Sequence, residues 1–257
     1  MSRISAFHSR GVMDGPGSVI RSMAAAMVPA TACGRYTWSV SVPEDTAEPL
    51  VAFAGLDVQP GDGGVEETQA EIQDCDILTV LDGALHNRKE LARDLGLDPS
   101  FHDTGMDEKL LVEGYLREGT NFFRRINGEF SLVLFDRKKN CLIAVRDRFG
   151  THPLFMTSDG ESYVIATEIK SLFAHPDFKA SPNMSLVRRY MFSSYRYTFG
   201  TEETFFEGVS LLAPNNIWVL EDGDVRQETL WEFDVANRSE ISDEDAIDQF
   251  HALLEDS

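Results

Sequence analysis

The fold is decided by residues 127–176, which read NGEFSLVLFDRKKNCLIAVRDRFGTHPLFMTSDGESYVIATEIKSLFAHP. Two apolar runs, 130–135 and 141–145, flank a polar turn at 136–140. Apolar runs on either side of a short polar turn predict a β-hairpin. Because the runs are continuous rather than alternating, we expect both faces of the two strands to be buried.

The hairpin is followed by Arg146-Asp147-Arg148-Phe149-Gly150. An Arg-Asp pair beside buried strands needs hydrogen-bond partners, so we expect both side chains to be held in structural hydrogen bonds. Further on, the sequence predicts a strand at 163–166 and a short helix that opens at 167–168 and ends before His175-Pro176.

In order and spacing, this stretch resembles the class II glutamine amidotransferase domain at the front of asparagine synthetases. That family reads N-G-x-F-A-x-x-x-x-D, then R-D-R-x-G-x-x-P-L, then A-S-E-I-K-x-L-x-x-H-P. The resemblance implies an α+β protein with the Ntn-hydrolase fold, a four-layer α-β-β-α sandwich of two antiparallel sheets. The positions of the family's structural motif correspond in this chain to Arg146, Asp147, Gly150, Pro153, Glu168 and Lys170.

Length and composition agree with one large domain and a short appendage in a chain of 257 residues. No apolar run approaches the ~18 residues of a membrane helix, and the start lacks a secretory apolar region. Three irregularly spaced cysteines predict neither a disulfide framework nor a metal site. We therefore expect a cytoplasmic protein with reduced thiols.

The chain is strongly acidic, with 43 Asp and Glu against 23 Lys and Arg and a net charge of −20. Such a charge argues against nucleic acid or an anionic membrane as a partner. Two interpretations stay open. The carboxylates can form a solvated acidic face, or they can reflect a halophilic host whose cytoplasm holds high salt.

The N-terminus reads Met1-Ser2-Arg3-Ile4, where the family reads Met-Cys-Gly-Ile. In the family, removal of Met exposes a Cys that is the nucleophile and carries its own base, the α-amine. Ser2 stands at that position. It is either a hydroxyl nucleophile or simply the first residue of an edge strand, and the weakness of a hydroxyl favours the strand. A rival idea, cleavage of a propeptide before Cys33, would remove the predicted strand 4–7, so a buried or loop thiol is favoured there.

Two positions that bind glutamine in the family differ in this chain. In the family, an Arg binds the glutamine α-carboxylate. The corresponding segment of this chain, residues 53–58, contains no Arg, and no neutral side chain replaces a bidentate guanidinium. The oxyanion hole of the family comes from an Asn side chain and a Gly N–H, which correspond to Asp82 and Gly83. A carboxylate repels an oxyanion, and loss of one donor costs about 3 kcal/mol. Asp82-Gly83 also fits a plain turn.

Two polar residues match the remaining substrate-binding positions of the family. The family reads N-G-E-I-Y-N where this chain reads residues 82–87, so Asn87 matches the last Asn of that motif. Asp107 matches the Asp that binds the substrate α-amino group in the family. Asp107 fits equally as a negative charge at the start of a helix. Both interpretations of Asp107 stay open.

The resemblance continues through residues 204–231, so we expect one glutamine amidotransferase-like domain at 1–234. Residues 235–257 are predicted to be a linker and the first helix of a truncated or absent asparagine synthase-type domain. No phosphate-binding Gly-rich loop occurs, so ATP and Mg are expected only for that downstream domain and no cofactor for this chain. The expected partners are such a domain in cis or trans, glutamine, and a second copy of the chain.

Three functions from different classes remain. The favoured one is a structural module with a degenerate glutaminase site, as in β-lactam synthetases and lasso peptide cyclases, because the nucleophile, the carboxylate-binding Arg and the oxyanion Asn are all replaced. The alternatives are the active glutamine-hydrolysing half of an asparagine synthetase and an amidohydrolase with Ser2 as nucleophile.

Overall fold

The computed structural model describes residues 3–9, 15–28, 35–41, 50–59, 64–69, 76–98, 106–160, 162–193, 202–221, 224–233 and 241–256. Its helices are α1 (Pro16–Met27), α2 (Arg88–Asp94), α3 (Asp107–Glu118), α4 (Ile169–Leu172), α5 (Met184–Ser193) and α6 (Asp243–Asp256), with a 3-10 helix, η2 (Gly119–Arg125). Its strands are β1 (Arg3–Ser9), β2 (Arg35–Ser41), β3 (Leu50–Gln59), β4 (Gly64–Gln69), β5 (Ile77–Leu85), β6 (Gly128–Asp136), β7 (Cys141–Arg146), β8 (Phe155–Ser158), β9 (Tyr163–Ala166), β10 (Val209–Leu211), β11 (Asn216–Glu221) and β12 (Asp224–Thr229).

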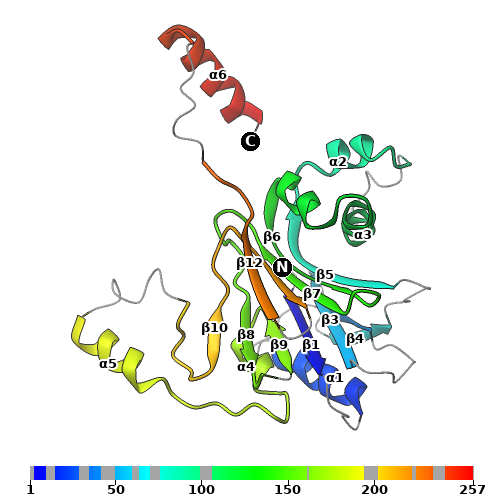
Figure 1. The fold of residues 1–257 in the computed structure, drawn as a ribbon, viewed down its shortest axis with the longest axis vertical. Coiled ribbons are helices and arrows are strands. Elements are labelled where there is room, and N and C mark those ends of the chain that lie inside the picture. Colours follow the sequence, from blue (N-terminus) through cyan, green and yellow to red (C-terminus); the bar gives the residue numbers. More distant parts are fainter. Residues whose placement is uncertain are drawn as a thin grey trace.

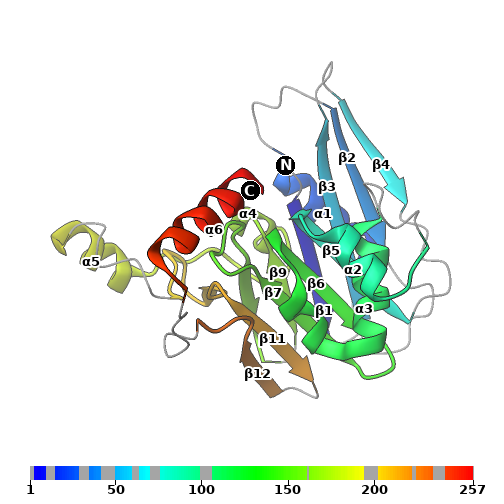
Figure 2. The same cartoon turned by 90° about the horizontal axis from the view of Figure 1, so that it is seen from above.

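The strands form two sheets that lie face to face (Figures 1 and 2). A seven-stranded sheet has the order β10-β8-β9-β1-β3-β2-β4, and a five-stranded sheet has the order β12-β11-β7-β6-β5. The pairs are antiparallel except at the edge, where β4 runs parallel to β2. The sequence of β4, GVEETQ, lacks the alternating apolar residues that mark a half-buried strand, so its pattern alone predicts no strand there.

Three apolar cores hold four layers together. One lies between the two sheets and includes Ile4, Phe53 and Val133. Another joins the seven-stranded sheet to α1 and α4, and the third joins the five-stranded sheet to α2, α3 and η2. The predicted α-β-β-α sandwich is therefore confirmed.

The predicted hairpin is β6 and β7, which pair from Ser131↔Arg146 to Asp136↔Cys141. Every residue of β7 is buried, and β6 is buried from Phe130 onward. The continuous apolar runs thus correspond to strands that are covered on one face by the second sheet and on the other by helices.

The first strand differs from its prediction. We expected an edge strand after Ser2, but β1 lies inside the seven-stranded sheet and pairs with both β3 and β9. Residues 4–9 are buried, which an interior strand covered on both faces requires. Ser2 itself lies outside the described residues.

Candidate active site

The candidate site is built around Asp82, on the strand β5 that forms the edge of the five-stranded sheet. Asp82 is only 3% exposed. Its Oδ1 lies 3.1 Å from Nδ1 of His152, in the segment between β7 and β8. This distance brings the carboxylate and the imidazole into contact, although Oδ1 accepts no well-aligned hydrogen bond from the described residues.

The electrostatic state of Asp82 follows from these surroundings. Burial raises the pKa of the Asp82 carboxyl above its ordinary value, because the charged form loses its hydration. The neighbouring His152 and, more weakly, Arg3 oppose that rise. A charge on this carboxylate is therefore held in the interior at a cost in free energy, with a histidine as its nearest counter-group.

His152 is fixed through its backbone. Its carbonyl oxygen accepts a hydrogen bond from Ser131 Oγ at 2.8 Å and another from Arg146 Nε at 2.9 Å. Ser131 stands directly opposite Asp82 in the β5–β6 pairing and opposite Arg146 in the β6–β7 pairing. Asp82 on β5, Ser131 on β6 and Arg146 on β7 are therefore neighbours across the sheet, and the last two hold His152 beside the Asp82 carboxylate.

Arg146 and Asp147 make the hydrogen bonds predicted for them. Besides His152, Arg146 donates to the carbonyl oxygens of Gly150 and Leu212. The Asp147 carboxylate accepts backbone N–H bonds from Phe130, Phe149 and Thr151, with distances of 3.2, 2.8 and 2.9 Å respectively. These contacts fold the segment that carries His152 back over the end of the hairpin.

Gly83, beside Asp82, has a backbone that only glycine fits. Its φ is +122°, and a Cβ there would lie 2.0 Å from the carbonyl oxygen of Glu129. The close approach of β5 to β6 at this point excludes any side chain. The Asp82-Gly83 segment is part of β5 and not an isolated turn.

The two predicted substrate-binding residues lie further along the chain. Asn87 braces two loops, since its Nδ2 donates to the carbonyl of Arg125 and its Oδ1 accepts from the N–H of Asn127, each at 2.9 Å. Both oxygens of Asp107 are engaged by Arg88. No contact between Asp107 and Asp82 is found among the described residues. Substrate binding by Asn87 or Asp107 stays a prediction.

The other motif residues are distributed around the start of β1 and the following loop. Glu168 forms an ion pair with Arg3, with Oε1 3.2 Å from Nε. Arg3 also donates to the carbonyl of Met27 at the end of α1. Pro153 and Lys170 are exposed. Arg3, the residue after Ser2, is thereby fixed to both α1 and the start of α4.

Sequence reasoning missed His152. A lone histidine before a proline carries no periodic or spacing signal, and its role depends on the long-range pairing of β5 with β6. Ser131 was also missed, because it lies within the apolar run 130–135, which the sequence predicts to be buried core.

Across the described ranges, no cluster of three or more His, Cys, Asp or Glu residues could hold a metal ion. In the same ranges, none of the helices has the length and apolar character needed to cross a bilayer.

Two face-to-face sheets with helices outside define the α-β-β-α sandwich class of folds. Among solved structures, the chain is similar to the glutamine phosphoribosylpyrophosphate amidotransferase of Bacillus subtilis, with a TM-score of 0.52 and 14% identity over 88% of this chain and 49% of that one. It is also similar to a structure described as the allosteric regulatory enzyme of purine biosynthesis, with a TM-score of 0.55, 14% identity and the same coverage. At this identity the likeness concerns the fold.

The chain belongs to the glutamine amidotransferase domain family, whose pattern matches residues 67–231, more than half of its length. Asparagine synthetase 3 of Bacillus subtilis is 34% identical over 101 residues, which cover 39% of this chain and 16% of that protein. A putative asparagine synthetase of Methanocaldococcus jannaschii is 26% identical over 172 residues, 63% of this chain and 31% of the relative. The amidase chyE of Penicillium rubens is 33% identical over 144 residues, 56% of this chain and 20% of the relative. The chain thus spans less than a third of these relatives.

Proposed function

We propose that this domain has no glutaminase activity and is a structural module for an ATP-dependent, amide-forming synthetase domain. The observation that carries the proposal is the buried Asp82 carboxylate. Amide hydrolysis by a nucleophile puts negative charge on the substrate oxygen, and an active site must stabilise that charge with hydrogen-bond donors. Asp82 stands where the family places a donor, and in its charged form it can only accept.

His152 does not reverse this argument. Its Nδ1 lies against the Asp82 carboxylate, so that nitrogen is directed at Asp82 and not at an incoming oxyanion. Two further replacements support the proposal from the sequence. Ser2 stands at the nucleophile position, and residues 53–58 offer no Arg for the glutamine α-carboxylate. Each change acts on a different requirement of the reaction, so restoring one would leave the others unmet.

The structural role is supported by α6, at the end of the described chain. Ile247, Phe250 and Leu253 on this helix are 57%, 63% and 70% exposed. In Figure 1 the helix stands clear of both sheets. Exposed large apolar side chains on one short helix are typical of an interaction surface. A synthetase-type domain in cis or trans is the partner that the relatives suggest.

The first test is ammonia release from glutamine by the purified chain, with removal of Met1 confirmed by mass spectrometry. We expect turnover far below about 1 s⁻¹, the lower end of ordinary enzyme turnover. Turnover near that value that disappears in a Ser2→Ala variant would refute the proposal and make Ser2 a nucleophile.

The second test concerns α6. In the chain alone, we expect its amides to exchange with solvent much faster than those of β6 and β7, because nothing in the described sandwich covers the helix. Addition of a synthetase-type domain should slow that exchange. Protection of α6 equal to that of the core strands in the isolated chain would contradict the structural role.

A further inference from the structure

A pocket of about 360 Å³ lies at the opposite end of β5 from Asp82. Its floor is where β5 begins and β6 ends, at the pair Ile77↔Asp136. Asp82 pairs with Ser131, five positions along the strand, so the pocket and the candidate site are roughly 17 Å apart. The pocket is therefore separate from the glutaminase position.

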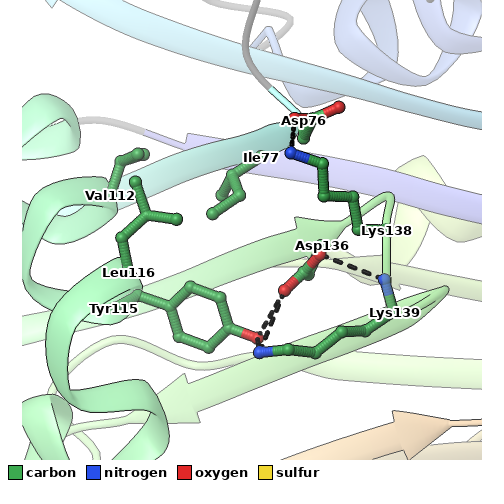
Figure 3. Close-up of a pocket in the computed structure, with 8 residues that line it drawn as sticks. All are labelled: Asp76, Ile77, Val112, Tyr115, Leu116, Asp136, Lys138 and Lys139. Carbon is green, nitrogen blue, oxygen red and sulfur yellow. Dashed lines mark hydrogen bonds and ion pairs between the residues drawn. The ribbon is translucent and has the colours of Figure 1, made fainter.

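One wall of the pocket is apolar. Ile77 comes from the sheet, while Val112, Leu116 and the ring of Tyr115 come from α3 (Figure 3). Leu116 is 63% exposed at the rim, although Ile77 and Tyr115 are buried. An apolar ligand group that covers this wall and its exposed leucine removes apolar surface from water, which favours binding.

The facing wall carries two ion pairs from the β6–β7 turn. Lys138 Nζ lies 2.5 Å from Asp76 Oδ2, and Lys139 Nζ lies 3.2 Å from Asp136 Oδ2. In Figure 3 both pairs lie on the side of the pocket away from Val112. The wall thus presents two ammonium groups and two carboxylates, and its charges balance.

The inner of these two ion pairs also contacts the buried Tyr115 hydroxyl, whereas the outer pair is exposed to solvent on both sides. Tyr115 Oη donates to Asp136 at 2.9 Å, and Lys139 lies 3.2 Å from the same hydroxyl. Burial raises the pKa of Tyr115 to about 12, so the phenol keeps its proton and stays a donor at neutral pH. The side chains of Lys138 and Asp76 are 75% and 50% exposed, and an exposed pair of this kind contributes little and can exchange partners.

We propose that this pocket binds a free α-amino acid with an apolar side chain, in its zwitterionic form. The carboxylate of the ligand would pair with the ammonium of Lys138 and its ammonium with the carboxylate of Asp76, while its side chain would cover Ile77, Val112 and Leu116. A zwitterion exchanges with the outer ion pair and leaves no charge uncompensated. A ligand with a single charge would leave either Asp76 or Lys138 without its counter-charge.

The test is isothermal titration of the intact chain with L-leucine and L-phenylalanine. Saturable binding with Kd at or below about 1 mM is expected. Glycine lacks the apolar group, 4-methylpentanoate lacks the ammonium, and 3-methylbutylamine lacks the carboxylate. Each should bind at least about tenfold more weakly than leucine.

Two variants test the location. Leu116→Asp charges the apolar rim and Lys138→Met removes the exchangeable ammonium, and each should weaken leucine binding by about tenfold or more. Both side chains are exposed, so folding should be retained, which thermal melting checks. The matched controls Leu253→Asp on α6 and Lys179→Met should bind leucine as the unchanged protein does.

Absence of saturable binding up to about 10 mM leucine and phenylalanine would overturn the proposal. Binding that both pocket variants retain would overturn the location. Equal affinity for leucine and 4-methylpentanoate would overturn the zwitterion as the ligand class.

Discussion

The proposed inactivity can be tested by giving the site back its missing groups one at a time. In a Ser2→Cys background, Asp82→Asn replaces a buried acceptor by an amide whose N–H₂ can donate to an oxyanion. The two side chains have nearly the same shape, and Gly83 keeps its unusual backbone. The change therefore tests the chemistry of position 82 with little change in packing.

The expected gain follows from the value of one oxyanion donor. Removing such a donor costs about 2.7–4 kcal/mol, or 10²–10³ in kcat, so restoring it should raise kcat by about 10² or more over Ser2→Cys alone. The missing carboxylate-binding Arg is not restored, so KM should stay high. A rise in kcat at constant KM indicates stabilisation of the transition state and not tighter substrate binding.

The assay is ammonia release at saturating glutamine, or its initial slope where saturation is not reached. The matched control is Ser2→Cys with Asp224→Asn, the same substitution at an exposed position on β12. If the double variant with Asp82→Asn is no faster than Ser2→Cys alone, Asp82 does not occupy the oxyanion position and the reasoning fails.

Three further predictions concern stability. Gly83→Ala should lower the free energy of unfolding, measured in urea, by more than about 3 kcal/mol, since its Cβ would overlap the backbone of Glu129. The control Gly96→Ala, with φ +63° and open space around the residue, should lower it by only about 1–2 kcal/mol. Equal losses in the two variants would show that the structure relieves the overlap at little cost. Asp147→Ala should cost at least about 3 kcal/mol because it leaves buried N–H groups without acceptors, while Asp177→Ala at an exposed position should be nearly neutral. Burial lowers the pKa of His175, so as the pH falls the unfolded chain binds a proton before the folded chain does, and stability should fall below about pH 6.5. His175→Leu should flatten this pH dependence of the unfolding free energy. An unchanged slope in the variant would assign the dependence to other groups.

The parts of the fold that the sequence predicted are those set by local pattern. The hairpin β6–β7 has contiguous apolar runs and a short polar turn, so its pairing needs no distant information. The interior place of β1 could not be derived in the same way, because it depends on pairing with β3 and with β9, more than 150 residues away. The acidic strand β4 lacks any apolar alternation and forms at the sheet edge beside β2.

The candidate site shows the same division. Position 82 was predicted as a site residue from its place in a motif, and the predicted consequence of a carboxylate there follows from its chemistry. Its contact with His152 was not predicted, since the two residues are 70 positions apart and Ser131 and Arg146 hold the His152 backbone beside Asp82. The pocket beside Tyr115 arises likewise from the packing of α3 against the start of β5, which no single stretch of sequence records.

The interior position of β1 has a consequence for synthesis of the chain on the ribosome. One neighbour of this strand, β9, ends at Ala166. At translation rates of about 5–20 residues per second, β1 waits roughly 8–30 s before that neighbour exists. During that interval its apolar residues and one row of its backbone groups have no final partner. The nascent chain therefore exposes an aggregation-prone strand before its neighbour is made, and we expect its yield to depend on chaperones that bind this strand.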